Sequence, residues 1–158
     1  MYYLGIIKRY SYCINTARPL TISSMSNTPL VWIIDDDDIS KYVMKRNLRQ
    51  LSVTNVIEFP DSVQPLKILS DNFESTNELP DIILLDLNMP ILNGFQFMEE
   101  FKVANEKIKK DIQIYMLTSS LSSEDVDRAK SFPEISEYFI KPITLRNLSR
   151  IVDIVLQE

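Results

Sequence analysis

Acidic, hydroxyl and basic side chains follow four separate apolar stretches of this sequence, at the point where each stretch ends. If these side chains meet, their carboxylates repel one another strongly, so either their pKa values rise or a cation lies among them. Oxygen ligands of this kind suit Mg²⁺, which keeps several waters and is well placed to meet a phosphoryl group. The apolar stretches, each with the side chains that follow it, are 30–34 with Asp35, Asp36, Asp37 and Asp38; 82–85 with Asp86; 112–117 with Thr118 and Ser119; and 138–140 with Lys141 and Pro142.

The hydrophobic pattern of the sequence predicts the strands and helices that would bring these residues together. Short apolar runs alternate with segments of helical period, which is typical of a parallel sheet with helices on both faces. We therefore predict an α/β, flavodoxin-like, doubly wound (βα)5 fold with strand order 2-1-3-4-5, in which Asp35, Asp36 and Asp86 converge at the carboxyl edge. The predicted strands are 30–34, 56–59, 82–85, 112–117 and 138–140; the helices are about 39–51, 62–69, from 94 past Phe101, 122–130 and 144–156; a long loop covers 71–80.

In that arrangement Asp86 is the candidate nucleophile, because a carboxylate can accept a phosphoryl group whose charge is neutralised from both sides. Lys141 supplies a positive charge opposite the metal, and Thr118 supplies a hydroxyl donor. Each feature also has a plainer interpretation: an aspartate run is often a solvated cap, and a Lys-Pro pair is often surface. Their joint placement at four strand ends favours chemistry.

Composition excludes several other functions. The 158 residues suffice for one ordinary domain, and 45% apolar with 25% charged residues indicates a globular protein with a core. There is no histidine, there are only two glycines, and the net charge is −5. Histidine-based triads and metal sites, glycine-rich phosphate loops and a basic nucleic-acid surface are therefore excluded. The single Cys13 suits a reducing compartment, and no run approaches the roughly 20 apolar residues of a membrane span.

The first 29 residues differ from the rest. They contain Lys8, Arg9 and Arg18 and no acidic residue, whereas residues 30–158 carry 14 basic and 22 acidic side chains. We expect 1–29 to be a flexible tail, or sequence upstream of a true start at Met25, and 30–158 to be the domain.

The residues around the strand ends resemble a known family, the receiver domains of two-component response regulators. The resemblance covers 30–158, in the family's order and spacing, and implies a stand-alone, CheY-like receiver because only a short remainder follows Lys141. Its most specific part is the block around Asp86. The matching segments are Val-Trp-Ile-Ile-Asp-Asp (31–36), Ile-Ile-Leu-Leu-Asp-Leu-Asn-Met-Pro (82–90) with Asn93-Gly94, Tyr-Met-Leu-Thr-Ser (115–119) and Tyr-Phe-Ile-Lys-Pro (138–142).

The resemblance implies a role for each matching position. Asp86 is the expected phosphoacceptor, and Mg²⁺ is the expected cofactor. The expected metal ligands are Asp36 directly, Asp35 more through water, Asp86, and the backbone carbonyl of Asn88. The expected phosphate-binding and switch residues are Thr118, Ser119, Lys141 and Tyr138, and the expected cis-proline is Pro142.

The resemblance also implies partners. The donor is a histidine kinase or phosphotransfer protein in trans, and the output is a downstream protein, or a homodimer, contacting the face formed by helix 122–130, strand 138–140 and helix 144–156. Ile151 and Ile154 lie outside the main stripe of the last helix, so they either meet this partner or line a broad core face. We expect a cytoplasmic phosphorelay switch rather than a turnover enzyme.

Two alternatives remain open. A haloacid-dehalogenase-type phosphohydrolase would use an Asp-x-Asp pair within 35–38 together with Thr118 and Lys141. That interpretation leaves the block around Asp86 without a role, and only Asp153 follows the lysine as a candidate acid. The other alternative is a receiver fold that serves only as a docking module, although no carboxylate or lysine is missing.

Overall fold

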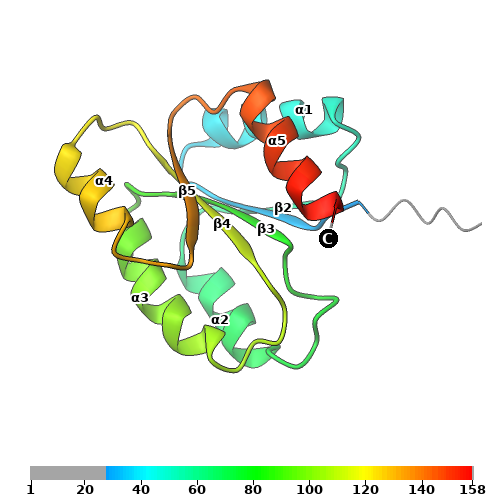
Figure 1. Ribbon diagram of the computed structural model, residues 1–158, viewed down its shortest axis with the longest axis vertical. Helices are drawn as coiled ribbons and strands as arrows, with labels where there is room; N and C mark the ends of the chain where they lie inside the picture. Colours follow the sequence, from blue (N-terminus) through cyan, green and yellow to red (C-terminus); the bar gives the residue numbers. More distant parts are fainter. Residues whose placement is uncertain (1–27, 158) are drawn as a thin grey trace, which may run out of the picture.

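Strands and helices alternate along residues 28–157, which are the residues that the computed structural model describes. The predicted tail therefore lies outside the described residues, apart from its last two positions. Each of the five predicted strand–helix pairs is present (Figure 1). The strands are β1 (Val31–Ile34), β2 (Val56–Phe59), β3 (Ile82–Asp86), β4 (Gln113–Thr118) and β5 (Ile135–Ile140); the helices are α1 (Asp38–Gln50), α2 (Val63–Asp71), α3 (Gly94–Asn105), α4 (Ser123–Ala129) and α5 (Leu145–Leu156).

The strands form one parallel sheet in the order β2-β1-β3-β4-β5, so the predicted fold class and strand order are confirmed. In the register of the sheet, Trp32 of β1 lies between Ile57 of β2 and Ile83 of β3. Because every pair is parallel, all carboxyl ends share one edge. In Figure 1, β1, β3 and β4 end toward the left. Loops from distant parts of the sequence therefore meet at this edge.

Apolar side chains cover both faces of the sheet, because successive residues of a strand point to opposite faces. Trp32 and Ile34 point into a core beneath α2, α3 and α4, whereas Val31 and Ile33 point into a second core beneath α1 and α5. Figure 1 shows these two helix layers. The continuous apolar runs of β1 and β3 follow from this double burial.

Polar residues begin the helices that lead away from the carboxyl edge. The side chain of Asp37 accepts a hydrogen bond from the backbone N–H of Ile39 at 2.9 Å, and the predicted cap Ser122 accepts one from Asp125. At α3, Asn93 and Gln96 cap each other's backbone N–H groups, each at 2.9 Å. These caps stabilise the first turns that border the candidate site.

One sequence prediction needs correction, and one alternative that the sequence left open is decided. Strand β5 begins at Ile135 rather than Tyr138, because it is an edge strand whose half-exposed residues give no continuous apolar run. Of the two interpretations left open for the last helix, Ile151 follows the core one, because it is only 1% exposed, whereas Ile154 is exposed. The apolar face of α5 is broad because the helix packs against both the sheet and α1.

At the opposite, amino edge of the sheet, one lysine connects several segments. Lys110 pairs with Asp81 at 2.8 Å and also donates to the backbone carbonyls of Thr76 (3.1 Å) and Leu79 (2.6 Å). The other carboxylate oxygen of Asp81 accepts from the backbone N–H of Leu30 at 2.6 Å. The predicted long loop before β3 is thereby tied to the starts of β1 and β3.

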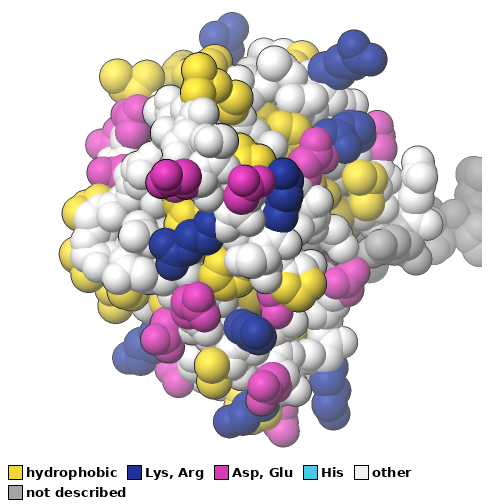
Figure 2. All heavy atoms as spheres, turned by 60° about the vertical axis from the view of Figure 1, so that its left-hand side comes forward, with side chains coloured by type: hydrophobic (Ala, Val, Ile, Leu, Met, Phe, Trp, Pro, Cys, Tyr) yellow, Lys and Arg dark blue, Asp and Glu magenta, His cyan; other side chains and the backbone are white. Residues whose placement is uncertain are grey.

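The surface carries charges of both signs. On the face that Figure 2 presents, acidic and basic side chains alternate with small groups of hydrophobic ones. None of the helices in residues 28–157 has the length and apolar character needed to cross a membrane.

Candidate functional site

Three carboxylates meet at the carboxyl edge of the sheet. One oxygen each from Asp35, Asp36 and Asp86 lie within 4.8 Å of one another. Asp35 and Asp36 follow β1, and Asp86 ends β3, its neighbour in the sheet. The predicted convergence of these residues is therefore present.

The three carboxylates differ in how much of their binding capacity the protein already uses. Asp35 is fully buried, and its Oδ1 accepts from the backbone N–H of Asp37 at 2.9 Å. Its Oδ2 accepts from the hydroxyl of Ser40 at 2.8 Å and from Lys141 at 2.6 Å. Asp36 is exposed, and the described part of the chain offers its carboxylate no hydrogen-bond donor. Asp36 is thus the carboxylate with free oxygens to bind a cation.

Lys141 joins the two buried carboxylates. Its Nζ lies 2.9 Å from Oδ1 of Asp86 and 2.6 Å from Oδ2 of Asp35. Burial lowers the pKa of Lys141, but hydrogen bonds to Asp35 and Asp86 and their charges outweigh burial, so the pKa is raised overall. Lys141 is therefore a fixed ammonium group between the two acids.

The pKa of Asp86 is raised from its usual value. Burial is the main cause, and the negative charge of Asp35 adds to it. The hydrogen bond and charge of Lys141, and the backbone hydrogen bond from Asn88, oppose the rise. A divalent cation beside Asp86 would act in the same direction as Lys141, because positive charge favours the ionised carboxylate. The atoms that could bind a metal in this cluster are all carboxylate oxygens, the kind of ligand that Mg²⁺ prefers.

Strand β4 lies on the opposite side of β3 from β1, and two hydroxyl residues stand at its end. Thr118 is fully buried, and its Oγ1 accepts from the backbone N–H of Ser120 at 3.0 Å. The side-chain amide of Asn88 approaches the same oxygen at 3.5 Å. Ser119, by contrast, is exposed at the surface. Of the two predicted hydroxyl residues, only Thr118 is built into the interior of the site.

The remaining predicted residues come from β5 and the segment after it. The phenol oxygen of Tyr138 is buried and has no hydrogen-bond partner within residues 28–157, and its ring packs against the core beneath α3. The predicted cis peptide bond between Lys141 and Pro142 is present. The backbone N–H of Lys141 donates to the carbonyl of Thr118 at 2.7 Å, which holds the two strand ends together.

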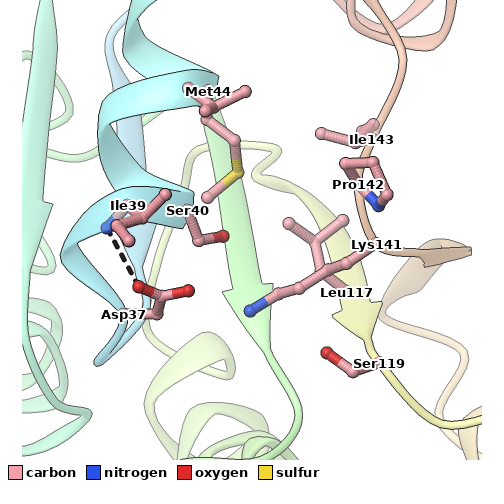
Figure 3. Close-up of a pocket in the computed structure, with 10 residues that line it drawn as sticks. Asp37, Ile39, Ser40, Met44, Leu117, Ser119, Lys141, Pro142 and Ile143 are labelled. Atoms are coloured by element: carbon pink, nitrogen blue, oxygen red, sulfur yellow. Dashed lines mark hydrogen bonds between the residues drawn. The ribbon is translucent and has the colours of Figure 1, made fainter.

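A cavity of about 280 Å³ opens beside Lys141, between the start of α1 and the segment that contains Pro142. Figure 3 shows the lysine side chain extending from this segment toward α1, with Asp37 and Ser40 on the opposite side. Met44, Leu117 and Ile143 form the apolar part of the lining. The cavity next to the charged site is therefore lined by both charged and apolar side chains.

Two contacts of the site were not predicted from the sequence, although Gly94 was recognised as a helix start and as part of the motif after Asp86. Ser40 binds Asp35 directly, and its position in the first turn of α1 was the only available signal. Gly94 starts α3 against the backbone of β3: a Cβ there would lie 2.9 Å from the carbonyl oxygen of Asp86 and 2.9 Å from Cα of Leu87. The glycine is needed for this close approach, which fixes α3 against the residue that carries the central carboxylate.

The fold and this carboxylate–lysine site together define a class of protein: a doubly wound α/β domain with three carboxylates and a lysine gathered at its carboxyl edge. Residues 31–153 match the family model described as the response regulator receiver domain. The chain belongs to that family.

Three similar proteins agree with this assignment. A probable methanogenesis regulatory protein, FilR2, of Methanothrix harundinacea is 28% identical over 125 residues, which cover 78% of this chain and 79% of that protein. A chemotaxis protein CheY homolog of Campylobacter jejuni is 27% identical over 124 residues, covering 78% and 89%. The crystal structure of a two-component response regulator from Cytophaga hutchinsonii is 27% identical, with a TM-score of 0.72 and coverage of 81% and 96%. The chain is thus similar to CheY-like response regulators, a family of signalling proteins.

Proposed function

We propose that Asp86 accepts a phosphoryl group from a phosphohistidine of a histidine kinase or phosphotransfer protein, and that the domain acts as a cytoplasmic phosphorelay switch. The observation that carries this proposal is the position of Lys141, 2.9 Å from Asp86 and 2.6 Å from Asp35. A carboxylate held beside an ammonium group and a cluster of oxygen ligands is suited to phosphoryl transfer, because charge on the transferring group is neutralised on both sides.

The transfer step balances without any further reagent. The phosphorus–nitrogen bond of the donor imidazole breaks while a phosphorus–oxygen bond forms to the Asp86 carboxylate. The imidazole keeps the electron pair and takes a proton from solvent. Lys141 stays protonated and can move its hydrogen bond from Asp86 to the phosphoryl oxygens. Asp36, Asp35, Asp86 and the carbonyl of Asn88 would hold Mg²⁺, which supplies charge neutralisation at the phosphoryl oxygens when it is bound.

The response would then pass from the site to β5. The buried hydroxyl of Thr118 is a donor that can turn toward phosphoryl oxygens, and its neighbour across the β4–β5 pair is Ile140. The phenol oxygen of Tyr138 has no partner among residues 28–157, so a new position costs it no hydrogen bond. Phosphorylation would favour one arrangement of these two side chains and so change the α4–β5–α5 face that meets a downstream protein or a second copy.

The phosphohydrolase alternative is less well supported by the hydrogen bonds. Such an enzyme would need Asp35 or Asp36 as its nucleophile. Both oxygens of Asp35 already accept hydrogen bonds from Asp37, Ser40 and Lys141, which lowers its nucleophilicity. Asp36 has free oxygens but is not paired with Lys141, whose two acid partners are Asp35 and Asp86. Turnover of p-nitrophenyl phosphate would favour this alternative. A docking module without phosphorylation would not need the lysine between two buried acids.

The test is phosphorylation of the purified chain by acetyl phosphate with and without Mg²⁺, measured by intact-protein mass spectrometry. We expect one phosphoryl group per chain, dependent on Mg²⁺, and none in Asp86→Asn. Lys141→Ala should keep Mg²⁺ binding but lose the change around Tyr138 that beryllofluoride produces in the native chain, observed by NMR. Labelling that persists in Asp86→Asn would refute the assignment.

A further inference from the structure

Two hydrogen-bond donors at the start of α1 hold the buried carboxylate of Asp35. Its Oδ1 accepts from the backbone N–H of Asp37 at 2.9 Å, and its Oδ2 accepts from the hydroxyl of Ser40 at 2.8 Å. Asp37 is the cap of α1 and Ser40 lies in the first turn, so both donors belong to one short helical segment. Because each carboxylate oxygen has its own donor, the group cannot rotate without losing one of these bonds.

The oxygen that Ser40 binds is also the oxygen that binds Lys141. The Nζ atom lies 2.6 Å from Oδ2 of Asp35 and 2.9 Å from Oδ1 of Asp86, so the lysine is closer to Asp35. The partly positive hydrogen of the Ser40 hydroxyl lowers the negative potential at Oδ2, and it therefore weakens the attraction between Asp35 and the ammonium group. Without this hydroxyl, Asp35 would draw Lys141 away from Asp86 and from a phosphoryl group bound to it.

The hydroxyl of Ser40 does little for the helix that carries it. The cap of α1 is Asp37, and serine inside a helix is less favourable than alanine. The side chain of Ser40 is half-buried and donates its hydrogen bond to Asp35. Figure 3 shows Ser40 on the side of the cavity opposite Lys141. A hydroxyl at this position is therefore explained by the carboxylate and the lysine, and not by the helix.

We propose that Ser40 is a positioning residue for phosphoryl transfer, which sets how Lys141 is shared between Asp35 and the phosphoryl group on Asp86; this rests on the proposed function. Ser40 exchanges no proton, and it acts through Asp35 and Lys141 alone. Lys141 keeps its protons and its bond to Asp35 while its second bond passes from Asp86 to a phosphoryl oxygen. Because Ser40 weakens the bond to Asp35, this second, charge-assisted bond is stronger.

The test compares Ser40→Ala with Ser40→Thr, which keeps a hydroxyl at the same position. At saturating Mg²⁺ we expect the rate of labelling by acetyl phosphate to fall about three- to tenfold in Ser40→Ala, the effect of one hydrogen bond, and to recover in Ser40→Thr. The dissociation constant for beryllofluoride should rise by the same factor. Ser149→Ala is the matched control and should change neither quantity, because it removes a serine hydroxyl that lies 3.5 Å from a carboxylate oxygen of Asp153 in α5.

Two further measurements separate positioning from folding. The dissociation constant for Mg²⁺, measured by calorimetry, should not rise in Ser40→Ala, because no metal ligand is removed and Asp35 keeps its charge. In the metal-free chain, the NMR signal of Nζ in Lys141 should move in Ser40→Ala and not in Ser149→Ala, since the lysine shifts toward Asp35. Ser40→Cys, whose thiol is a weak donor, should also be labelled more slowly than the native chain, and it carries the test if the alanine variant does not fold.

The outcomes separate the two proposals. If acetyl phosphate does not label Asp86 of the native chain, the proposed function fails. If it does, but Ser40→Ala is labelled and binds beryllofluoride like the native chain, Ser40 serves stability alone, and the positioning proposal is overturned while the proposed function stands. A loss of Mg²⁺ affinity in proportion to the loss of labelling would also overturn it, because Ser40 would then act through the metal and not through Lys141.

Discussion

At the scale of single residues, the site depends on a carboxylate held where its charge is poorly solvated. Burial raises the pKa of Asp86, and Lys141 opposes the rise without cancelling it. An acceptor of phosphoryl groups must be ionised to react, so the fold carries an uncompensated part of that charge until a cation binds beside it. The residue that serves the proposed function thus works against stability.

Asp86→Asn should therefore stabilise the protein in a pH-dependent way. The folded-state pKa of Asp86 is above its unfolded value, so the stability it contributes is full below the unfolded pKa and is lost as pH rises through the folded pKa. The pKa of Lys141 is also raised, so its contribution is lost only in strongly alkaline solution and stays constant across this window. Without Mg²⁺, the stability advantage of the variant over the native protein should grow as the pH rises above the ordinary carboxyl pKa of 3.8, until Asp86 of the native protein is fully ionised.

Urea unfolding followed by the fluorescence of Trp32 measures this difference, because Trp32 is the single tryptophan and is 1% exposed. Asp127→Asn alters an exposed acid of α4 and serves as the control. Parallel stability curves for the native chain and Asp86→Asn at all pH values would contradict the prediction.

At the scale of elements, the sequence predicts what depends on burial and order along the chain. The apolar runs of β1, β3 and β4 identify these strands, and the polar residues that end them converge because parallel strands share one carboxyl edge. The start of β5 is missed because an edge strand need not be apolar on both faces. Gly94 is recognisable only as part of a pattern, since its close approach to β3 is a property of the packed structure.

Gly94→Ala tests whether this packing positions the site. The added Cβ would lie 2.9 Å from backbone atoms of Asp86 and Leu87, so α3 or the end of β3 must shift. We expect a loss of about 1 to 3 kcal/mol in the free energy of unfolding, with slower labelling by acetyl phosphate. Glu99→Ala, at an exposed position of the same helix, should change neither quantity. Normal labelling in a destabilised Gly94→Ala would show that the contact serves stability alone.

At the scale of the whole molecule, the candidate site lies at the carboxyl edge of the sheet, and a stabilising network lies at the amino edge. The carboxyl edge gathers carboxylates, Lys141 and exposed aliphatic side chains. The amino edge contains the network of Lys110 and Asp81, which ties the loop before β3 to the start of β1. Mutations at one edge should therefore change stability and leave the chemistry of the other edge intact.

Lys110→Met should change the free energy of unfolding without changing Mg²⁺ binding at the carboxyl edge. It leaves Asp81 without its cation and the carbonyls of Thr76 and Leu79 without their donor, so we expect a loss of about 1 to 3 kcal/mol after allowing for partial exposure to solvent. The increase in the urea midpoint that Mg²⁺ produces should match that of the native chain, because the metal ligands lie at the other edge. Lys109→Met, an exposed neighbour without an ion pair within the described residues, should have little effect on either. A smaller Mg²⁺-induced increase in the urea midpoint, seen in Lys110→Met but not in Lys109→Met, would contradict this prediction. It would mean that a change in the loop before β3 reaches Asp86 through β3, so that the two edges are coupled.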